Sequence, residues 1–258
     1  MHPERAKVLV HGVPETSDVW TPLIDELAAL GLRDVVRLSP PGFGAPMPGG
    51  FGATLDGYQD WLIAELSRFD APVDLVGHDF GGVHTMNVAM GRPDLLHSWT
   101  TDTVGLFASD YVWHPTAQTW QTPGDGEQNI KEVFGGSVAD RAAMMAQWGF
   151  PARIADKLAA AQGDEMGRAI LALYRSAAQP ALAGKGRDLP AAAGRPGLAL
   201  MPTEDPFVGS LVQRRGASER SGARTATLDG LGHLWMVEDP AGSARVLADF
   251  WAAVDAPS

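Results

Sequence analysis

The residue with the clearest chemical potential is Asp79, which lies between two glycines in the run Gly77-His78-Asp79-Phe80-Gly81. A short apolar run precedes it and a helix-compatible stretch follows, so the pattern predicts a tight strand-turn-helix that exposes the central side chain. A carboxylate with an ordinary pKa of about 3.9 is ionised at neutral pH and can attack an sp3 carbon without a base. The pattern also fits an ordinary turn with a capping Asp, so the rest of the chain must supply catalytic partners.

Composition sets the class of protein. The chain has 258 residues, of which 45% are hydrophobic and 20% charged, enough for one domain with an inserted lobe. A formal net charge of -11 without a long basic run argues against nucleic acid or an anionic membrane as partner. There is no cysteine, no leader-like start and no apolar run near the roughly 20 residues that span a bilayer. We therefore expect a cytoplasmic protein, and the sequence leaves the oligomeric state open.

The elements that position Asp79 alternate along the chain. Short apolar runs at 7–10, 35–38 and 73–76 predict strands, and amphipathic stretches at 17–30 and 55–69 predict helices between them. Such alternation implies a parallel sheet covered on both faces. A further strand is expected at 98–103, and the pattern resumes at 197–201 and 223–228 before a closing helix at 240–254.

The intervening segment is different. Residues 105–190 contain helical stretches at 139–148 and 166–176 with several large aromatic residues, and they predict a mostly helical cap insertion. The expected organisation is therefore a catalytic lobe of residues 1–104 and 191–258 with a cap of residues 105–190.

Four motifs in chain order resemble the α/β-hydrolases, and within them the epoxide hydrolase and haloalkane dehalogenase branch. The motifs are His11-Gly12-x-Pro14, Gly77-His78-Asp79-x-Gly81-Gly82, Glu204-Asp205-Pro206, and Gly232-His233 followed by Glu238-Asp239-Pro240. The order nucleophile, acid, histidine is the one that this fold uses. The resemblance implies an α/β-hydrolase fold with a mainly parallel sheet. Members usually begin with two antiparallel strands, whereas this first strand begins by Lys7, so we expect about six mainly parallel strands.

The resemblance also implies roles for these residues. Asp79 would attack an alkyl carbon and form an ester, and His233 would then activate the water that hydrolyses the ester. Asp205 would orient His233, and the backbone N–H groups of Val13 and Phe80 would form the oxyanion hole.

Some assignments leave alternatives open. Asp102, just after another expected strand, is an alternative orienting acid, although chain order favours Asp205. His11 and His78 lie beside glycines at strand ends and are expected to be structural, bonding to the backbone of their turns.

The substrate depends on the group that assists the leaving atom. An epoxide oxygen needs an acid, and Tyr174-Arg175 resembles the position of one cap tyrosine of epoxide hydrolases. The segment 120–127 resembles the one that carries the other, but Thr119 stands where tyrosine is expected, so His114 or Tyr111 would have to replace it. The reaction that the resemblance implies is thus the opening of an epoxide to a diol, with a small apolar or amphipathic organic molecule as substrate.

A haloalkane dehalogenase is the alternative. Such enzymes hold the halide with indole N–H groups, often one directly after the nucleophile, where this chain has Phe80. Trp113, Trp120 or Trp148 of the cap would have to donate instead. A lyase or cyclase and a non-catalytic binding module of the same fold are further alternatives. No paired ligand spacing or phosphate-binding glycine motif indicates a metal or an organic cofactor.

Overall fold

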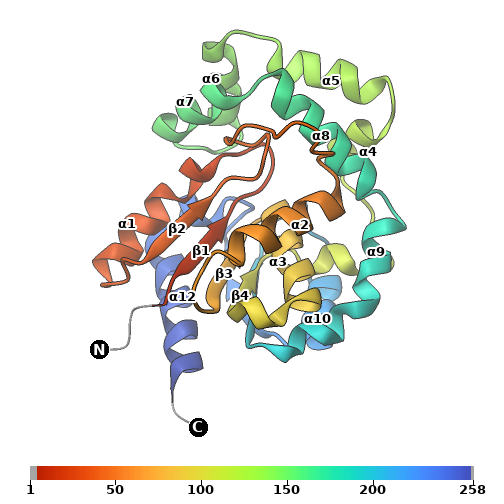
Figure 1. The fold of residues 1–258 in the computed structure, drawn as a ribbon. Helices are drawn as coiled ribbons and strands as arrows, with labels where there is room; N and C mark the ends of the chain where they lie inside the picture. Colours follow the sequence, from red (N-terminus) through yellow and green to blue (C-terminus); the bar gives the residue numbers. More distant parts are fainter. Residues whose placement is uncertain (1–4, 257–258) are drawn as a thin grey trace.

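The computed structural model describes residues 5–256, and a single six-stranded parallel sheet forms their centre (Figure 1). The strands are β1 (Lys7–Val10), β2 (Val35–Leu38), β3 (Val73–Gly77), β4 (Leu96–Thr101), β5 (Gly197–Pro202) and β6 (Arg224–Leu228). Their order is β2-β1-β3-β4-β5-β6, and every neighbouring pair is parallel. The expected number and direction of strands are confirmed.

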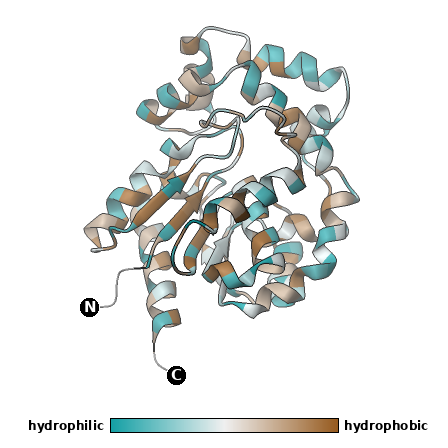
Figure 2. Cartoon of the chain, viewed as in Figure 1, coloured by the Kyte–Doolittle hydropathy of each residue, from teal (hydrophilic) through white to brown (hydrophobic). Residues whose placement is uncertain are grey.

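Helices cover both faces of the sheet, as the alternating pattern predicted. On one face lie α1 (Thr21–Ala29), α11 (Trp235–Glu238) and α12 (Pro240–Asp255), and on the other α2 (Leu55–Leu66), α3 (Phe80–Gly91) and α10 (Leu211–Ser221). Each face has its own cluster of buried apolar side chains, and the strands are largely hydrophobic (Figure 2). Burial on both faces explains why the inner strands β1 and β5 are mostly apolar, whereas the edge strand β6 is largely exposed and carries Arg224, Thr225 and Thr227.

The helix expected at 17–30 is divided in the structure. A 3-10 turn at Ser17–Trp20 precedes α1, and Pro22 lies in the first turn of α1. Proline has no N–H to donate, so it is tolerated at the start of a helix but not in its interior. Most large apolar residues of the predicted helix do face the core, but they belong to two successive elements.

The segment between β4 and β5 is helical. After a 3-10 turn at Val104–Phe107 come α4 (Pro115–Gln121), α5 (Asp125–Phe134), α6 (Val138–Gln147), α7 (Ala152–Ala161) and α8 (Asp164–Ser176). The short α9 (Ala181–Lys185) and a 3-10 segment at Gly186–Gly194 lead back into β5. Figure 1 shows α4–α8 gathered on one side of the sheet, forming the helical insertion. Among the described helices, none is long and apolar enough to cross a membrane.

The sheet order determines where a site can form. From β1 the chain goes to β2 on one side and then returns past β1 to β3 on the other, so the order reverses between β1 and β3. Val10 and Gly77 are paired at the ends of these two strands. In open parallel sheets, ligands bind beyond the carboxyl ends of the strands at such a reversal.

Close backbone contacts occur where β3 turns into α3. A Cβ on Gly81 would lie 2.2 Å from the Val10 carbonyl oxygen, and one on Gly77 would lie 2.3 Å from the Gly81 carbonyl oxygen. Real side chains do not tolerate such contacts. Only glycine therefore lets α3 begin this close to β1 and β3.

The Gly81→Ala variant should test this packing, because its new methyl group would push α3 away from β1. We expect the free energy of unfolding to fall by about 1–3 kcal/mol, as for other overpacked sites. The matched control is Gly216→Ala in α10, where a Cβ would meet nothing within 4 Å and where alanine should stabilise the helix by up to about 1 kcal/mol. Urea denaturation of both variants measures the difference, and equal effects would contradict the close-packing argument.

Candidate active site

Asp79 occupies a left-handed backbone conformation at the tip of the turn between β3 and α3. Its φ is 50° and its ψ is -125°, a region that residues other than glycine rarely adopt. The Val13 N–H donates to Oδ1 of Asp79 at 2.9 Å. Oδ2 does not receive this bond and faces His233, with 4.0 Å between Oδ2 and His233 Nε2. One oxygen is thus held by a backbone donor and the other is available for attack.

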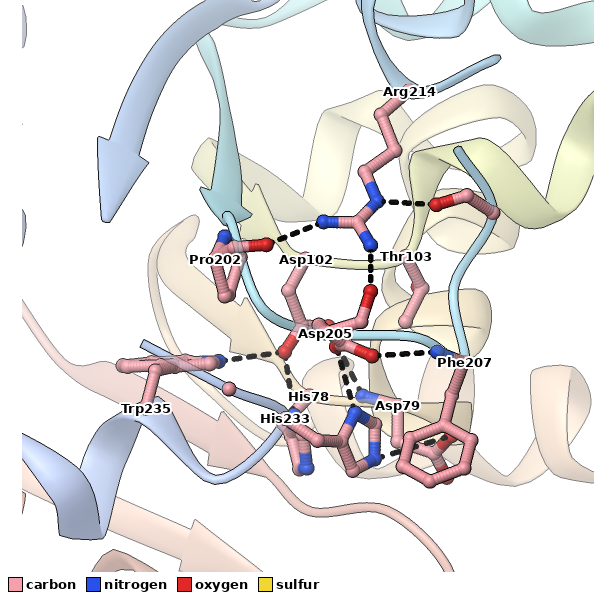
Figure 3. Close-up of polar contacts among 12 residues, drawn as sticks. His78, Asp79, Asp102, Thr103, Pro202, Asp205, Phe207, Arg214, His233 and Trp235 are labelled. Atoms are coloured by element: carbon pink, nitrogen blue, oxygen red, sulfur yellow. Dashed lines mark hydrogen bonds and ion pairs between the residues drawn. The ribbon is translucent and has the colours of Figure 1, made fainter. Parts of the chain in front are cut away.

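His233 and Asp205 form a direct pair beside Asp79 (Figure 3). Nδ1 of His233 lies 2.8 Å from Oδ2 of Asp205, and Oδ1 of Asp205 accepts the Phe207 N–H at 2.8 Å. The Nδ1 bond to a carboxylate fixes the tautomer, so Nε2 of neutral His233 is an acceptor facing Asp79. The 4.0 Å between Nε2 and Oδ2 is too long for a hydrogen bond between the two side chains.

Burial and charge act in opposite directions on these three groups. Burial raises the pKa of Asp79, and the opposing effects of His233, His78 and backbone N–H groups only partly offset it. Burial lowers the pKa of His233, but the charge and hydrogen bond of Asp205 outweigh it, so the pKa is raised. For Asp205 burial is likewise outweighed, here by His233, and the pKa is lowered.

Asp102, the alternative acid, does not contact His233. Its Oδ1 accepts the backbone N–H of Asp79 at 3.1 Å, and its Oδ2 lies 2.5 Å from Nδ1 of His78 and accepts the Trp235 Nε1–H at 2.7 Å (Figure 3). The side chain is completely buried. The geometry therefore pairs His233 with Asp205 and commits Asp102 to the turn beneath Asp79.

The place of His78 beside a glycine predicts a bond from its ring to the backbone of the turn, and this prediction is wrong, because both ring nitrogens face carboxylates. Its Nδ1 bonds to Asp102 and its Nε2 lies 3.2 Å from Oε1 of Glu15. Burial lowers its pKa, but the two carboxylates outweigh burial and raise the pKa well above its usual value. The His78 ring lies 4.5 Å, centroid to centroid, from that of His233. His11, in contrast, does bond to backbone, with 2.9 Å between Nδ1 and the Gly12 carbonyl oxygen.

Glu15 is a site residue that the sequence analysis missed. Its Oε2 accepts the Gly12 N–H at 3.1 Å while Oε1 faces His78, so it joins the loop after β1 to the turn after β3. It also lines the cavity above Asp79. The available signal was an acidic residue directly after the His-Gly-x-Pro motif, but its partner lies 63 residues away.

A cavity of about 300 Å³ opens above Asp79 and His233. Most of its wall is apolar or aromatic, and those side chains are Val13, Pro14, Trp120, Trp148, Phe150, Tyr174, Phe207 and Leu234. No lysine or arginine is among the residues that line it. The cavity therefore suits an uncharged, largely apolar molecule.

His114 is among the residues that line this cavity. It caps the start of α4, and its Nδ1 accepts the Ala117 N–H at 3.3 Å, so the proton of the neutral ring lies on Nε2. Burial lowers the pKa of His114 to about 4, the charge of His233 adding to the effect. At neutral pH the ring is therefore uncharged and donates from Nε2.

The Tyr174 side chain also lines the cavity, and its ring packs edge-on against Phe80 with 4.8 Å between centroids. Burial, with the charge of Asp79, raises its pKa well above the usual value, so the phenol keeps its proton. Arg175, the next residue, forms a bidentate pair with Glu127 at 2.8 and 2.9 Å. This pair joins α8 to α5 and supports the helix that carries Tyr174.

The remaining leaving-group candidates are less well placed. The Tyr111 hydroxyl donates to the Phe207 carbonyl at 2.7 Å, and the Trp120 indole donates to Asn129 Oδ1 at 2.8 Å. Trp148 lines the cavity but is 44% exposed. The buried Nε1 of Trp113 has no hydrogen-bond partner within the described part of the chain.

The structure thus brings Asp79, His233, Asp205 and the Val13 and Phe80 N–H groups together, with His114 and Tyr174 facing them across a cavity. Within residues 5–256 no cluster of three or more His, Cys, Asp or Glu side chains is arranged to hold a metal ion.

Comparisons with known proteins agree with this arrangement at the level of the fold. The haloalkane dehalogenase DbeA from Bradyrhizobium elkani is similar, with 17% identity, a TM-score of 0.76 and coverage of 100% of this chain and 93% of that one. A putative ancestral haloalkane dehalogenase gives 17% identity, a TM-score of 0.74 and coverage of 100% and 94%. A thermophilic esterase from Thermogutta terrifontis gives 17% identity, a TM-score of 0.72 and coverage of 98% of this chain and 91% of that one.

No curated protein matches the sequence. A family model described as "Alpha/beta hydrolase family", however, matches residues 8–246, nearly the whole chain. Together with the sheet order and the helical insertion α4–α8, this match shows that the chain belongs to the alpha/beta hydrolase family.

Proposed function

We propose that the protein is a hydrolase that opens a small, uncharged epoxide to a diol through an ester on Asp79. The observation that supports this choice most strongly is the pair of neutral donors, His114 Nε2–H and the Tyr174 hydroxyl, in the wall of the cavity above Asp79. An opening epoxide develops charge on oxygen, and hydroxyl and imidazole donors suit an alkoxide.

In the first step, Oδ2 of Asp79 attacks an epoxide carbon, a new C–O bond forms and the ring C–O bond breaks. The ring oxygen takes its proton from Tyr174, because an alkoxide is a far stronger base than a phenolate. His114 holds the same oxygen by a hydrogen bond. Since the charge of Asp79 raises the pKa of Tyr174, loss of that charge on ester formation makes the phenol more acidic as its proton is needed.

In the second step, His233 removes a proton from water, which attacks Cγ of Asp79. The tetrahedral intermediate places its negative charge on Oδ1, already held by the Val13 N–H. Its collapse breaks the bond between Cγ and the ester oxygen Oδ2, which takes the proton from His233 and leaves as the second hydroxyl of the diol. Asp79 is left as the carboxylic acid, and its proton returns to the Tyr174 phenolate, so one water is consumed in the cycle. The charge of Asp79 helps to raise the pKa of His233, so forming the ester also lowers that pKa. Alkylation therefore shifts His233 toward the neutral form that acts as a base.

A haloalkane dehalogenase is the second candidate. Proteins of similar fold include haloalkane dehalogenases, and the unpartnered Trp113 Nε1–H lies on an indole ring stacked against Phe80 with centroids 5.9 Å apart. An indole N–H can bind a halide ion. The hydrogen bond between Trp120 and Asn129, however, removes one of the expected indole donors from the cavity.

The ester intermediate should be trapped in the His233→Gln variant, since this change leaves Asp79 able to attack but removes the base for hydrolysis. Mass spectrometry after incubation with a reactive epoxide such as styrene oxide should show one adduct on the peptide that contains Asp79. Asp79→Asn is the control and should show none. An adduct on another residue, or turnover by Asp79→Asn at the wild-type rate, would falsify the mechanism.

Removing the Tyr174 hydroxyl in Tyr174→Phe should slow epoxide alkylation by on the order of 100-fold and leave ester hydrolysis nearly unchanged, because only the first step needs this proton. His114→Phe should slow the same step to a smaller extent. Trp113→Phe and Trp120→Phe serve as indole controls. Single-turnover kinetics on an epoxide and a bromide of equal chain length measure the effects.

Halide release that depends on Trp113, together with epoxide opening that is indifferent to Tyr174, would instead favour the dehalogenase. No reaction of wild type with either substrate would favour a lyase or a binding module.

The two acids should behave differently in Asp205→Asn and Asp102→Asn. The first should slow ester hydrolysis by on the order of 10⁴-fold, because asparagine no longer selects the correct His233 tautomer, with little loss of stability. The second should lower the free energy of unfolding by about 3–5 kcal/mol, because it leaves buried His78 without one of its two carboxylates. Chemical denaturation and ester-hydrolysis rates test the contrast, and an inactive but fully stable Asp102→Asn protein would contradict it.

A further inference from the structure

Arg214 of α10 is a buried arginine close to the site whose charge has no obvious counterpart. Its side chain is 2% exposed, and within residues 5–256 no carboxylate oxygen lies within ion-pair distance of its guanidinium group. A buried charge without a partner is costly, so a side chain held in this way needs strong alternative contacts. The contacts of the guanidinium group therefore indicate the role of Arg214.

All three guanidinium nitrogens donate to backbone carbonyl oxygens of the loop that carries Asp205 (Figure 3). Nε donates to Gly209 at 2.7 Å, Nη1 donates to Pro202 at 2.6 Å, and Nη2 donates to Asp205 itself. Pro202 is the last residue of β5 and Gly209 precedes the N-cap of α10. One planar group therefore joins the start, the middle and the end of the loop from Pro202 to Gly209.

Any movement of the loop from Pro202 to Gly209 would disturb the contacts of the Asp205 carboxylate. Both Asp205 oxygens are in use, Oδ1 by the Phe207 N–H and Oδ2 by His233. The Arg214 stem also fills the space beside Gly105, where an added Cβ would lie 2.9 Å from Arg214 Cγ. Displacement of Arg214 would thus shift the carboxylate relative to His233.

We propose that Arg214 is a positioning residue, which holds the Asp205 loop so that the Asp205 carboxylate accepts the Nδ1–H of His233. It acts through Asp205 and does not line the cavity above Asp79. The rigid fork of arginine suits three carbonyls in fixed directions, whereas lysine would keep the charge without the fork.

Several charged groups face this arrangement and bear on any pH profile. Asp205 and Asp102 act on Arg214, whereas Asp205, Asp79 and His78 act on His233. Arg214→Met also removes a charge that acts on Asp205, whereas Arg214→Lys keeps that charge, so a shift seen in both Arg214 variants reports the position of Asp205.

The test compares Arg214→Met and Arg214→Lys with the exposed Arg215→Met on the same helix. Proton NMR of the free protein should show a low-field signal from the His233 Nδ1–H, identified by its absence in His233→Gln. We expect this signal in wild type and Arg215→Met and its loss or broadening in both Arg214 variants. This readout needs no substrate, so it stands even if the proposed function fails.

The kinetic readout does rest on the proposed function. Ester hydrolysis should slow by up to about 100-fold in Arg214→Met, the cost of a small misplacement, and less in Arg214→Lys, while alkylation of Asp79 stays nearly unchanged. The pH profile of hydrolysis should also shift in the Arg214 variants alone. Equal slowing of both steps, an unchanged His233 signal, or failure of both variants to fold would overturn the proposal in favour of a purely structural role.

Discussion

The site depends on one unfavourable backbone conformation, the positive φ of Asp79. A residue other than glycine in such a region costs about 1–3 kcal/mol, which surrounding contacts must offset. Asp102 helps to stabilise this conformation by accepting the Asp79 N–H. The close contacts of Gly77 and Gly81 hold the start of α3 against β1 and β3. The strain has a chemical result, because it points the carboxylate of Asp79 away from the sheet, toward the Val13 N–H and His233.

Charge is balanced around this turn by two imidazoles with different duties. His78 lies between Asp102 and Glu15, which contact its two ring nitrogens and, against the effect of burial, raise its pKa well above the usual value. His233 has Asp205 and shares the influence of Asp79, which changes charge in the proposed cycle. His78 favours the ionised form of Asp79 against the effect of burial. In the proposed cycle, His233 is the imidazole that takes up and releases a proton.

Sequence patterns predicted the parts of this structure that depend on local order. The strand at Val35–Leu38 and the turn at Asp79 follow from apolar runs and glycines, and the order of the motifs placed Asp205 before His233. Patterns could not show that Asp102 receives the indole N–H of Trp235, 133 residues away, or that Tyr111 donates to Phe207. Such bonds depend on how the sheet and cap meet, so the choice among the leaving-group candidates required the fold.

Phe80 illustrates how one side chain connects the two lobes. The sequence assigned its backbone N–H to the oxyanion hole and noted that its side chain has no hydrogen-bond donor, and in the structure its ring also contacts Trp113 and Tyr174. The residue directly after Asp79 thus also supports the cap tyrosine. An indole at this position would bring a donor next to Asp79, whereas the phenyl ring leaves that role to groups on the cap. Two cap side chains pack on Phe80, the indole of Trp113 and the phenol of Tyr174, so the phenyl ring places one donor suited to a halide and one suited to an alkoxide beside the same residue.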